Sequence, residues 1–313
     1  MQTVERTLCA AFTTTLLASV PAQASHPPQN VAVSGTAKQF EFVATRPNSG
    51  GHAFARQVLP AAAKLEGVAQ SRVLYLNPDG AILTPGYNDS RTDSSSIVTE
   101  PTLINGWDID YDTWDATVSC IRDLYSRFDV TVTDEDPGDV PHIEALFGGH
   151  PSDVGLPDNV AGVSPFTTDC SIIENSIVFT FTDVLPDDPQ VMCEVMGQEI
   201  AHSFGLDHEM LPSDPMTYLD YAGPRTFQND MAPCGEFEDR MCGINGSVCR
   251  DRQNSVQMLE SRLGRRGAEG VPPEPLTTTT EPEDLAGCQA SGSGAPLSGM
   301  VVAAILWRRR KRR

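Results

Sequence analysis

The stretch Asp188–His208, with the sequence DPQVMCEVMGQEIAHSFGLDH, predicts a helix followed by a tight turn. Asp188 is a typical N-cap residue, and Pro189 suits the first helical position. Gly205 suits the left-handed conformation that often ends a helix. We therefore expect a helix from Pro189 to about Phe204, with an apolar side made by Val191, Met192, Val195, Met196 and Ile200.

The last turn of this predicted helix carries Gln198, Glu199 and His202. Positions 198 and 202 are i and i+4, so their side chains share one face of the helix. A turn at Gly205 brings His208 back toward the same point. The spacing predicts a metal site with three ligands and a carboxylate beside it.

The segment QEIAHSFGLDH resembles the metzincin zinc-protease signature H-E-x-x-H-x-x-G-x-x-H at four of its five fixed positions. Asp214–Tyr218 (DPMTY) resembles the Met-turn of the same family. The close spacing resembles the matrixin-like branch, whereas Glu209 and the Met-x-Tyr pattern resemble astacin-like and serralysin-like sites. The resemblance covers residues 72–263. It implies an α+β, metzincin-like fold, in which a mixed sheet carries an active-site helix above a small disulfide-stapled lower subdomain.

The resemblance also implies roles for individual residues. His202 and His208 would bind one catalytic Zn²⁺ through imidazole nitrogens, and Glu199 would be the general base. Met216 would support the floor of the metal site without binding the ion, and Tyr218 would touch the metal or stabilise an oxyanion. The implied function is an exported or surface-anchored zinc-dependent endopeptidase that acts on peptide or protein substrates.

Gln198 stands where the family has its first histidine. An amide oxygen is a weaker zinc ligand than an imidazole nitrogen. Three outcomes remain open at this stage: Gln198 ligates weakly, His142 or His150 takes its place, or the site is a remnant. The remnant would make the chain a catalytically inactive, metzincin-fold surface binding protein.

Two further groups of residues suit metal ions. Clustered carboxylates suit Ca²⁺, although no loop with the required glycine spacing appears, and a solvated acidic face is the alternative. The segment that contains His150 and Asp153 resembles a structural-metal loop of matrixins. The alternative interpretation is a plain Gly/Pro turn. The acidic cluster consists of Asp108, Asp110, Asp112 and Asp115.

Outside the active-site helix, apolar periodicity predicts one strand, then a helix, then several strands, which is an α+β layout. By analogy with the family, the strand at Val160–Val163 or the one at Ile177–Phe181 is the edge strand that pairs with an extended peptide substrate. The predicted strands are Val73–Leu76, Val130–Thr133, Ile143–Phe147, Val160–Val163 and Ile177–Phe181, and the predicted helices are Ala116–Phe128 and Arg252–Leu263.

Charge and motif content exclude other classes of function. The chain has 22 Lys+Arg against 42 Asp+Glu, a net charge of −20, which repels phosphate backbones and anionic lipid surfaces. Nucleic acid is therefore excluded as the default partner. G-x-S-x-G, a P-loop and a G-x-G-x-x-G after a strand are all missing, so serine-hydrolase and nucleotide-binding functions have no support.

The eight cysteines indicate disulfides rather than a zinc ribbon, because no C-x₂-C pair occurs. Without Cys9 in the predicted leader and Cys288 near the C-terminus, six remain, and about 15 pairings of six cysteines are open. Disulfides are typical of exported proteins. The close spacing of Cys234, Cys242 and Cys249 predicts a stapled region with little regular structure.

The two ends predict targeting segments. Residues 1–24 have the pattern of a signal peptide ending in Ala22-Gln23-Ala24, and residues 25–71 would be a pro-segment or spacer. A Pro/Thr-rich linker at 264–286 leads to a segment at 287–313 with the order Gly-Cys, apolar run, Arg-rich end. That order resembles myxobacterial C-terminal sorting signals, with an ordinary tail anchor as the alternative. We expect an extracellular or cell-surface protein that meets the membrane only through this segment.

Overall fold

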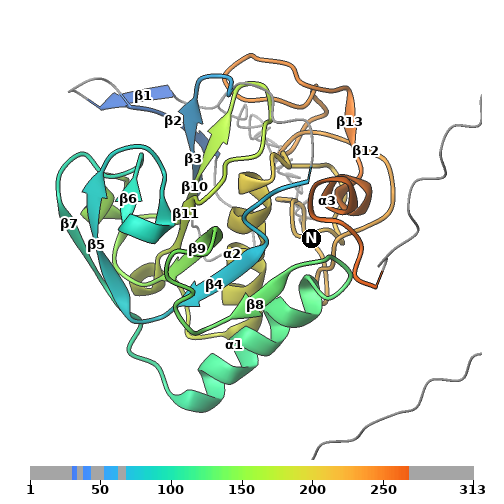
Figure 1. Cartoon of the computed structure of the whole chain (residues 1–313). Helices are drawn as coiled ribbons and strands as arrows, with labels where there is room; N and C mark the ends of the chain where they lie inside the picture. The colour runs from blue at the N-terminus through green and yellow to red at the C-terminus, as the bar shows by residue number, and fades with distance from the viewer. Residues whose placement is uncertain (1–29, 34–37, 44–52, 63–67, 268–313) are drawn as a thin grey trace, which may run out of the picture. The chain divides into compact units, whose positions relative to one another are not determined.

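The computed structural model describes residues 30–33, 38–43, 53–62 and 68–267 (Figure 1). The predicted signal peptide, most of the predicted linker and the predicted sorting segment lie outside these residues. Within the described ranges, no helix is both long enough and apolar enough to cross a membrane.

The described residues form a mixed α+β fold around one large sheet. Its strand order is β1-β2-β3-β10-β11-β9-β4-β8. The strands β8, β4, β9 and β11 run parallel, whereas β10 is antiparallel to β11. The strands are β1 (Asn30–Val33), β2 (Lys38–Val43), β3 (Ala53–Leu59), β4 (Val73–Asn77), β8 (Thr131–Thr133), β9 (His142–Phe147), β10 (Val160–Thr167) and β11 (Ile177–Thr180).

Each face of this sheet is covered by different elements. The helices α1 (Tyr111–Leu124) and α2 (Pro189–Ser203) pack against one face, and α2 lies against β9, β10 and β11. The other face packs against a small sheet of order β6-β5-β7. Its strands are β5 (Gly80–Pro85), β6 (Ser94–Ser95) and β7 (Thr102–Asn105), and the short 3₁₀ turns are η1 (Ser90–Thr92), η2 (Pro151–Val154) and η3 (Thr182–Val184).

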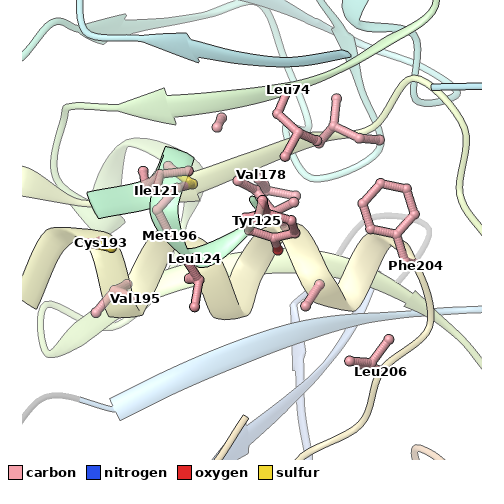
Figure 2. Packing of buried hydrophobic residues seen from close by; sticks show 14 of the residues in the cluster. Leu74, Ile121, Leu124, Tyr125, Val178, Cys193, Val195, Met196, Phe204 and Leu206 are labelled. Atoms are coloured by element: carbon pink, nitrogen blue, oxygen red, sulfur yellow. The ribbon is translucent and has the colours of Figure 1, made fainter. Parts of the chain in front are cut away.

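Successive side chains of a buried strand point to opposite faces of the sheet, so one strand contributes to both cores. On β11, Val178 belongs to the core under the helices, whereas Ile177 and Phe179 belong to the core under the small sheet. Figure 2 shows Val178 next to α2, in the cluster of buried residues that also contains Ile121 of α1. The strand is therefore buried on both sides, as its continuous apolar sequence requires.

The helix α2 forms where the sequence predicts it. The Asp188 side chain accepts hydrogen bonds from the backbone N–H groups of Gln190 and Val191, and Pro189 occupies the first turn. The helix ends at Ser203, and Gly205 has φ of 71°, the left-handed value expected of it. A β-carbon at position 205 would lie 2.2 Å from the carbonyl oxygen of Cys170, so only glycine fits there.

The helix α1 begins earlier than the apolar pattern predicts. It starts at Tyr111, because Asp110 caps it by accepting from the Thr113 N–H, and it ends at Leu124 rather than Phe128. The first turns are polar and exposed, so they carry no apolar periodicity. Tyr125 and Phe128 are buried beyond the helix end.

The region after α2 contains little regular structure, and disulfides tie it, as predicted. It contains β12 (Ala232–Pro233), β13 (Arg252–Gln253) and α3 (Ser255–Leu263), so Arg252 and Gln253 belong to a strand and the last helix is shorter than predicted. The six cysteines in the described ranges form three disulfides, which are typical of oxidising compartments. The pairs are Cys120–Cys193, Cys170–Cys249 and Cys234–Cys242.

The N-terminal strands extend the sheet, which the sequence did not indicate. We predicted a pro-segment or spacer at residues 25–71 and assigned no strand there, yet β3 pairs in parallel with β10 and continues through β2 to β1. The prediction that β10 is an edge strand open to a peptide is therefore wrong, because β3 occupies that edge. The prediction for Ile177–Phe181 as the edge is also wrong, since β11 lies between β10 and β9.

Candidate metal centre

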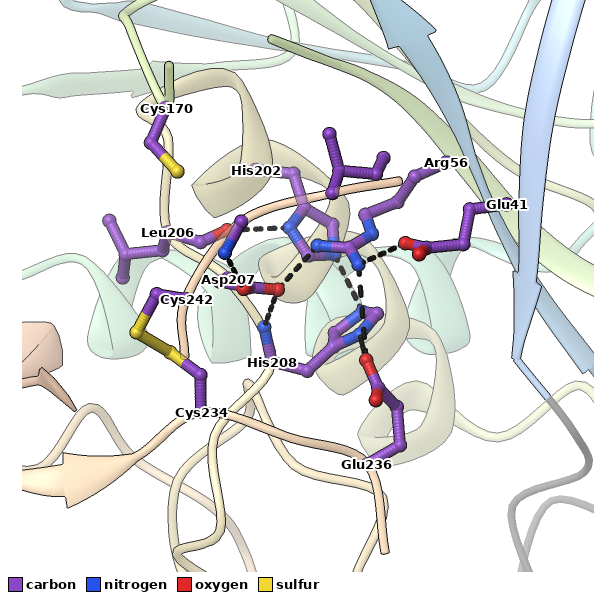
Figure 3. Close-up of polar contacts among 12 residues, drawn as sticks. Glu41, Arg56, Cys170, His202, Leu206, Asp207, His208, Cys234, Glu236 and Cys242 are labelled. Atoms are coloured by element: carbon purple, nitrogen blue, oxygen red, sulfur yellow. Dashed lines mark hydrogen bonds and ion pairs between the residues drawn. A yellow bond between two sulfur atoms is a disulfide. The ribbon is translucent and has the colours of Figure 1, made fainter. Parts of the chain in front are cut away.

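Two predicted histidines meet at the C-terminal end of α2. The last turn of the helix holds His202, the chain reverses at Gly205, and His208 returns to face it. Their Nε2 atoms lie 3.1 Å apart, and both side chains are about 1% exposed (Figure 3). The structure thus brings the predicted pair together in the manner that the spacing required.

In each histidine, the hydrogen bond at Nδ1, the ring nitrogen that faces away from the other histidine, defines the tautomer. His202 Nδ1 lies 2.7 Å from the carbonyl oxygen of Leu206, and His208 Nδ1 lies 2.8 Å from Glu236 Oε1. Both oxygens accept, so each Nδ1 carries the hydrogen. Burial, together with the positive charge of Arg56, lowers the pKa of His208 to about 4, and the pKa of His202 is lowered as well, so both rings are neutral.

Two lone pairs therefore face each other across the short contact between the Nε2 atoms. Such a contact between two acceptors is repulsive unless a cation lies between them. Each outer nitrogen is held by an acceptor, which is the arrangement that orients metal-binding histidines in proteins. The donor set fits a soft or borderline divalent ion such as Zn²⁺.

Tyr218 and the turn before it complete one side of the site. The Tyr218 hydroxyl lies 3.2 Å from His208 Nε2, and its ring contacts the His208 ring edge-on. Met216 is fully buried, and its carbonyl oxygen accepts a hydrogen bond of 2.9 Å from the Glu209 N–H. Asp214 closes the turn by accepting from the Met216 N–H. The turn is thereby tied to the residue that follows His208.

Gln198 and Glu199 are buried on α2 beside the histidine pair. Neither the oxygen nor the nitrogen of the Gln198 amide has a hydrogen-bond partner, although the side chain is completely buried. Glu199 Oε2 is also unpartnered, and burial raises the pKa of this carboxyl to about 8. Buried polar groups without partners are rare, so these two side chains require an explanation.

The sequence did not identify a network of charged residues beside His208. Asp207 accepts from Arg56 Nη1 at 2.5 Å and from Arg240 Nη1 at 2.6 Å. Arg240 also pairs with Glu236. The two guanidinium groups outweigh the effect of burial and hold the pKa of Asp207 well below its usual range.

A close approach of backbone and side chain seats Glu199 against the sheet. A β-carbon on Gly162 of β10 would lie 2.7 Å from Glu199 Oε1. This glycine therefore makes room for the carboxyl group, a role that sequence reasoning did not assign.

The other predicted ligands have different tasks. His142 Nδ1 bonds to the carbonyl oxygen of Val140, and His150 forms a capping box with Asp153 at the start of η2. The glycine-rich turn at His150 is thus a structural turn in this fold. Asp110 caps α1, so one member of the predicted Ca²⁺ cluster serves a helix instead.

Buried acidic, histidine and cysteine groups near His208 are close enough to hold a metal ion. One such group combines Asp207 with Cys234 and Cys242, but these two sulfurs are bonded to each other. Another combines Asp207, His208 and Glu236, whose carboxylates are already paired with arginines. The facing Nε2 atoms of His202 and His208 are the better candidates, because their lone pairs point at each other and neither nitrogen is held in an ion pair.

The sequence gives only weak signals for Arg56 and Glu236, which it did not place at the site. Arg56 stands as a lone charge in the run AFARQVL, which is the one available hint that it is buried and paired. Glu236 lies far along the chain from His208, with no motif that links them. No protein-family model matches this chain, and neither a curated protein nor a solved structure matches it.

Proposed function

We propose that this chain is an exported zinc-dependent endopeptidase with a metzincin-like site. The observation that carries the proposal is the pair of facing Nε2 lone pairs on His202 and His208, 3.1 Å apart and completely enclosed. A bound zinc ion would relieve their repulsion. Tyr218 contacts His208, and Gln198 and Glu199 stand on the last turns of α2, the helix that carries His202.

His202 and His208 would hold the ion through Nε2, and the unpartnered Gln198 oxygen would be the third ligand from α2. Leu206 and Glu236 would fix the orientation of the two rings through Nδ1. An amide oxygen is a weaker ligand, so we expect lower zinc affinity than three histidines provide.

Zinc bound there would supply Lewis acidity for attack of water on a peptide carbonyl. Glu199 would take the proton from the attacking water and pass it to the leaving amine. Without a metal ion, burial raises the pKa of Glu199 to about 8, although a hydrogen bond with Ser164 and the charge of Arg56 oppose the change, so the group is largely protonated at neutral pH. A neighbouring cation favours the carboxylate and lowers this pKa, which makes the group a base. The Tyr218 hydroxyl would donate a hydrogen bond to the developing oxyanion.

The second candidate is a surface binding protein that has kept the fold and lost metal chemistry. Gln198 favours it, because a neutral amide replaces an imidazole at the first ligand position. It predicts that the purified protein holds no zinc and that Glu199→Gln changes none of its functions.

The test is the zinc content of the protein after production under oxidising conditions and dialysis against trace zinc. One ion per chain, with peptide hydrolysis that Glu199→Gln abolishes, is the expected result. A folded protein with no zinc would overturn the endopeptidase proposal and favour the binding protein.

Gln198→His separates a weak metal site from a collapsed one. We expect zinc affinity to rise on the order of tenfold or more, because imidazole replaces an amide. The matched control is Gln190→His on the same helix, where the amide already bonds to Glu194 Oε1 at 2.8 Å. Equal affinities in both variants and the parent protein would show that position 198 faces no metal.

A further inference from the structure

A short loop closed by a disulfide lies against the candidate site. Cys234 and Cys242 are bonded to each other, and we call the chain between them the 234–242 loop. The backbone N–H of Gly235 donates to the carbonyl oxygen of His208 at 3.0 Å, so the loop starts beside a predicted ligand. Its disulfide is therefore part of the surroundings of the site.

Two neighbouring side chains of the loop reach the site. Glu236 accepts from His208 Nδ1 at 2.8 Å, as Figure 3 shows. The next residue, Phe237, packs against the ring of Tyr218, with centroids 6.1 Å apart. Tyr218 in turn contacts the His208 ring edge-on. The loop thus holds His208 directly through Glu236 and indirectly through Tyr218.

Arg240 fixes the carboxylate of Glu236 in this position. Its Nη2 and Nε donate to the two oxygens of Glu236 at 2.5 and 3.1 Å, which makes a bidentate pair. Its Nη1 donates to Asp207, the residue before His208, at 2.6 Å. Arg56 adds a longer contact of 3.8 Å to Glu236. One arginine of the loop therefore ties the loop's carboxylate to the segment that carries His208.

The disulfide is the covalent bond that keeps this loop closed. The loop contains no helix and no extended strand, and a pocket of about 460 Å³ lies beside it, lined in part by Pro233 and Met241. Both sulfurs are buried, so a reductant reaches them only when the loop opens. Segments with little regular structure open locally at low free energy. We therefore expect this disulfide to be reduced before the one that joins α1 to α2.

We propose that the 234–242 loop is a redox-sensitive clamp on the metal site. Arg240 and the closed disulfide position Glu236 on His208, and reduction of the disulfide by a dithiol weakens metal binding. This inference deepens the proposed function and rests on it for the identity of the metal as zinc.

The redox step is a thiol–disulfide exchange. One thiol of the reductant attacks a sulfur of the pair, and the second thiol then displaces the protein from the mixed disulfide. The reductant becomes a disulfide, and its two electrons and two protons leave Cys234 and Cys242 as thiols.

Opening the loop removes the acceptor from His208 Nδ1. The hydrogen of the neutral ring then occupies either nitrogen, and the tautomer with hydrogen on Nε2 has no lone pair there for a metal. Partners that orient metal-binding histidines are worth about 10–100-fold in metal affinity. His202 keeps its own partner, the Leu206 carbonyl oxygen, which lies outside the loop.

The first test measures zinc affinity of the full chain by competition with a chelator, before and after treatment with a dithiol. We expect affinity to fall by about tenfold or more, and by as much in the double variant Cys234→Ser, Cys242→Ser. The matched control is Cys120→Ser, Cys193→Ser, which removes the disulfide between the helices. Its zinc affinity should stay close to that of the parent protein, because Cys193 lies well before His202 on α2. Alkylation and mass spectrometry identify the disulfide that is reduced first.

The second test needs no metal. Nitrogen NMR of the metal-free protein with labelled histidine reports the tautomer of each of the six histidines. We expect His208 to carry its hydrogen on Nδ1 in the parent protein and to populate both tautomers in Glu236→Ala and in the Cys234→Ser, Cys242→Ser variant. Glu236→Gln keeps an acceptor oxygen and should retain most of the parent tautomer. The His202 tautomer should not change in any of them.

The outcomes distinguish the clamp from the proposed function. An unchanged His208 tautomer in folded variants, or earlier reduction of another disulfide, would overturn the clamp. Zinc affinity that rises on reduction would also overturn it, since the freed thiols and Asp207, whose ligand atoms lie within 4.8 Å of one another, would then bind the ion. A changed tautomer in a protein that binds no zinc would support the positioning of His208 by the loop and overturn the endopeptidase. One zinc per chain with unchanged affinity in the open loop would leave the endopeptidase and overturn the clamp.

Discussion

Two buried carboxylates in this protein are paired with arginines, whereas a neutral amide at the candidate site is not partnered at all. Asp207 has two arginine partners and Glu194 has Arg225. By contrast, the Gln198 amide is buried without partners. Because an unsatisfied buried polar group costs about 1–3 kcal/mol, this position is expected to have a compensating ligand.

Glu144 is a buried carboxyl outside the candidate site that makes stability depend on pH. It lies on β9 and is about 2% exposed, with one oxygen accepting from Asn77 Nδ2 at 2.7 Å. Burial raises its pKa from 4.5 to about 7, although the Asn77 hydrogen bond opposes the change. Between pH 4.5 and about pH 7, the folded state keeps a proton on Glu144 that the unfolded state releases. The free energy of unfolding therefore falls as pH rises through this range.

We expect Glu144→Gln to remove this loss, which amounts to about 3 kcal/mol above pH 7, and to keep the acceptor that Asn77 uses. Urea unfolding between pH 5 and pH 8 measures it, with the exposed Glu100→Gln as a control for net charge. Parallel stability curves for Glu144→Gln and the parent protein would contradict the assignment.

Local sequence predicted those site residues whose positions depend on one helix and one turn. His202, Gly205 and His208 follow from helical spacing and a glycine that reverses the chain. Arg56 and Glu236 reach the same place from distant segments through tertiary packing. No local pattern fixes such contacts, so the sequence alone could not place them.

At the scale of the element, prediction followed the local signals. The helix α2 has both its cap and its closing glycine in the sequence, and its bounds were predicted to within one residue. The start of α1 was missed because its first turns are polar and its cap alone marks the beginning. The strand β3 was missed because it is stabilised by pairing with β10, about a hundred residues further along the chain.

The packing of α2 against β10 depends on Gly162. Gly162→Ala would place a β-carbon 2.7 Å from Glu199 Oε1 and 2.8 Å from the Phe179 carbonyl oxygen. We expect a loss of about 1–3 kcal/mol in unfolding free energy, as for other overpacked cores. Measured by urea unfolding in the Glu199→Ala background, the loss should be smaller, because half of the clash is gone. An identical loss in both backgrounds would show that Glu199 does not lie against this strand.

At the scale of the molecule, disulfides and strand pairing join segments that are far apart in sequence. The disulfide Cys120–Cys193 connects α1 to α2, and Cys170–Cys249 connects the end of β10 to the region after the candidate site. The N-terminal strands β1, β2 and β3 extend the sheet beyond β10. The fold therefore depends on contacts of long sequence separation, which disulfides favour by restricting the unfolded chain.

The stability contributed by each disulfide should follow the length of chain it encloses. Cys120 and Cys193 are 73 residues apart, whereas Cys234 and Cys242 are 8 apart. The chain-entropy relation gives about 4 kcal/mol for the first and about 2.5 kcal/mol for the second. We expect replacement of each pair by alanine to lower the free energy of urea unfolding in that order. Equal losses, or a larger loss for the short loop, would mean that native packing around the sulfurs, and not restriction of the unfolded chain, sets their contribution.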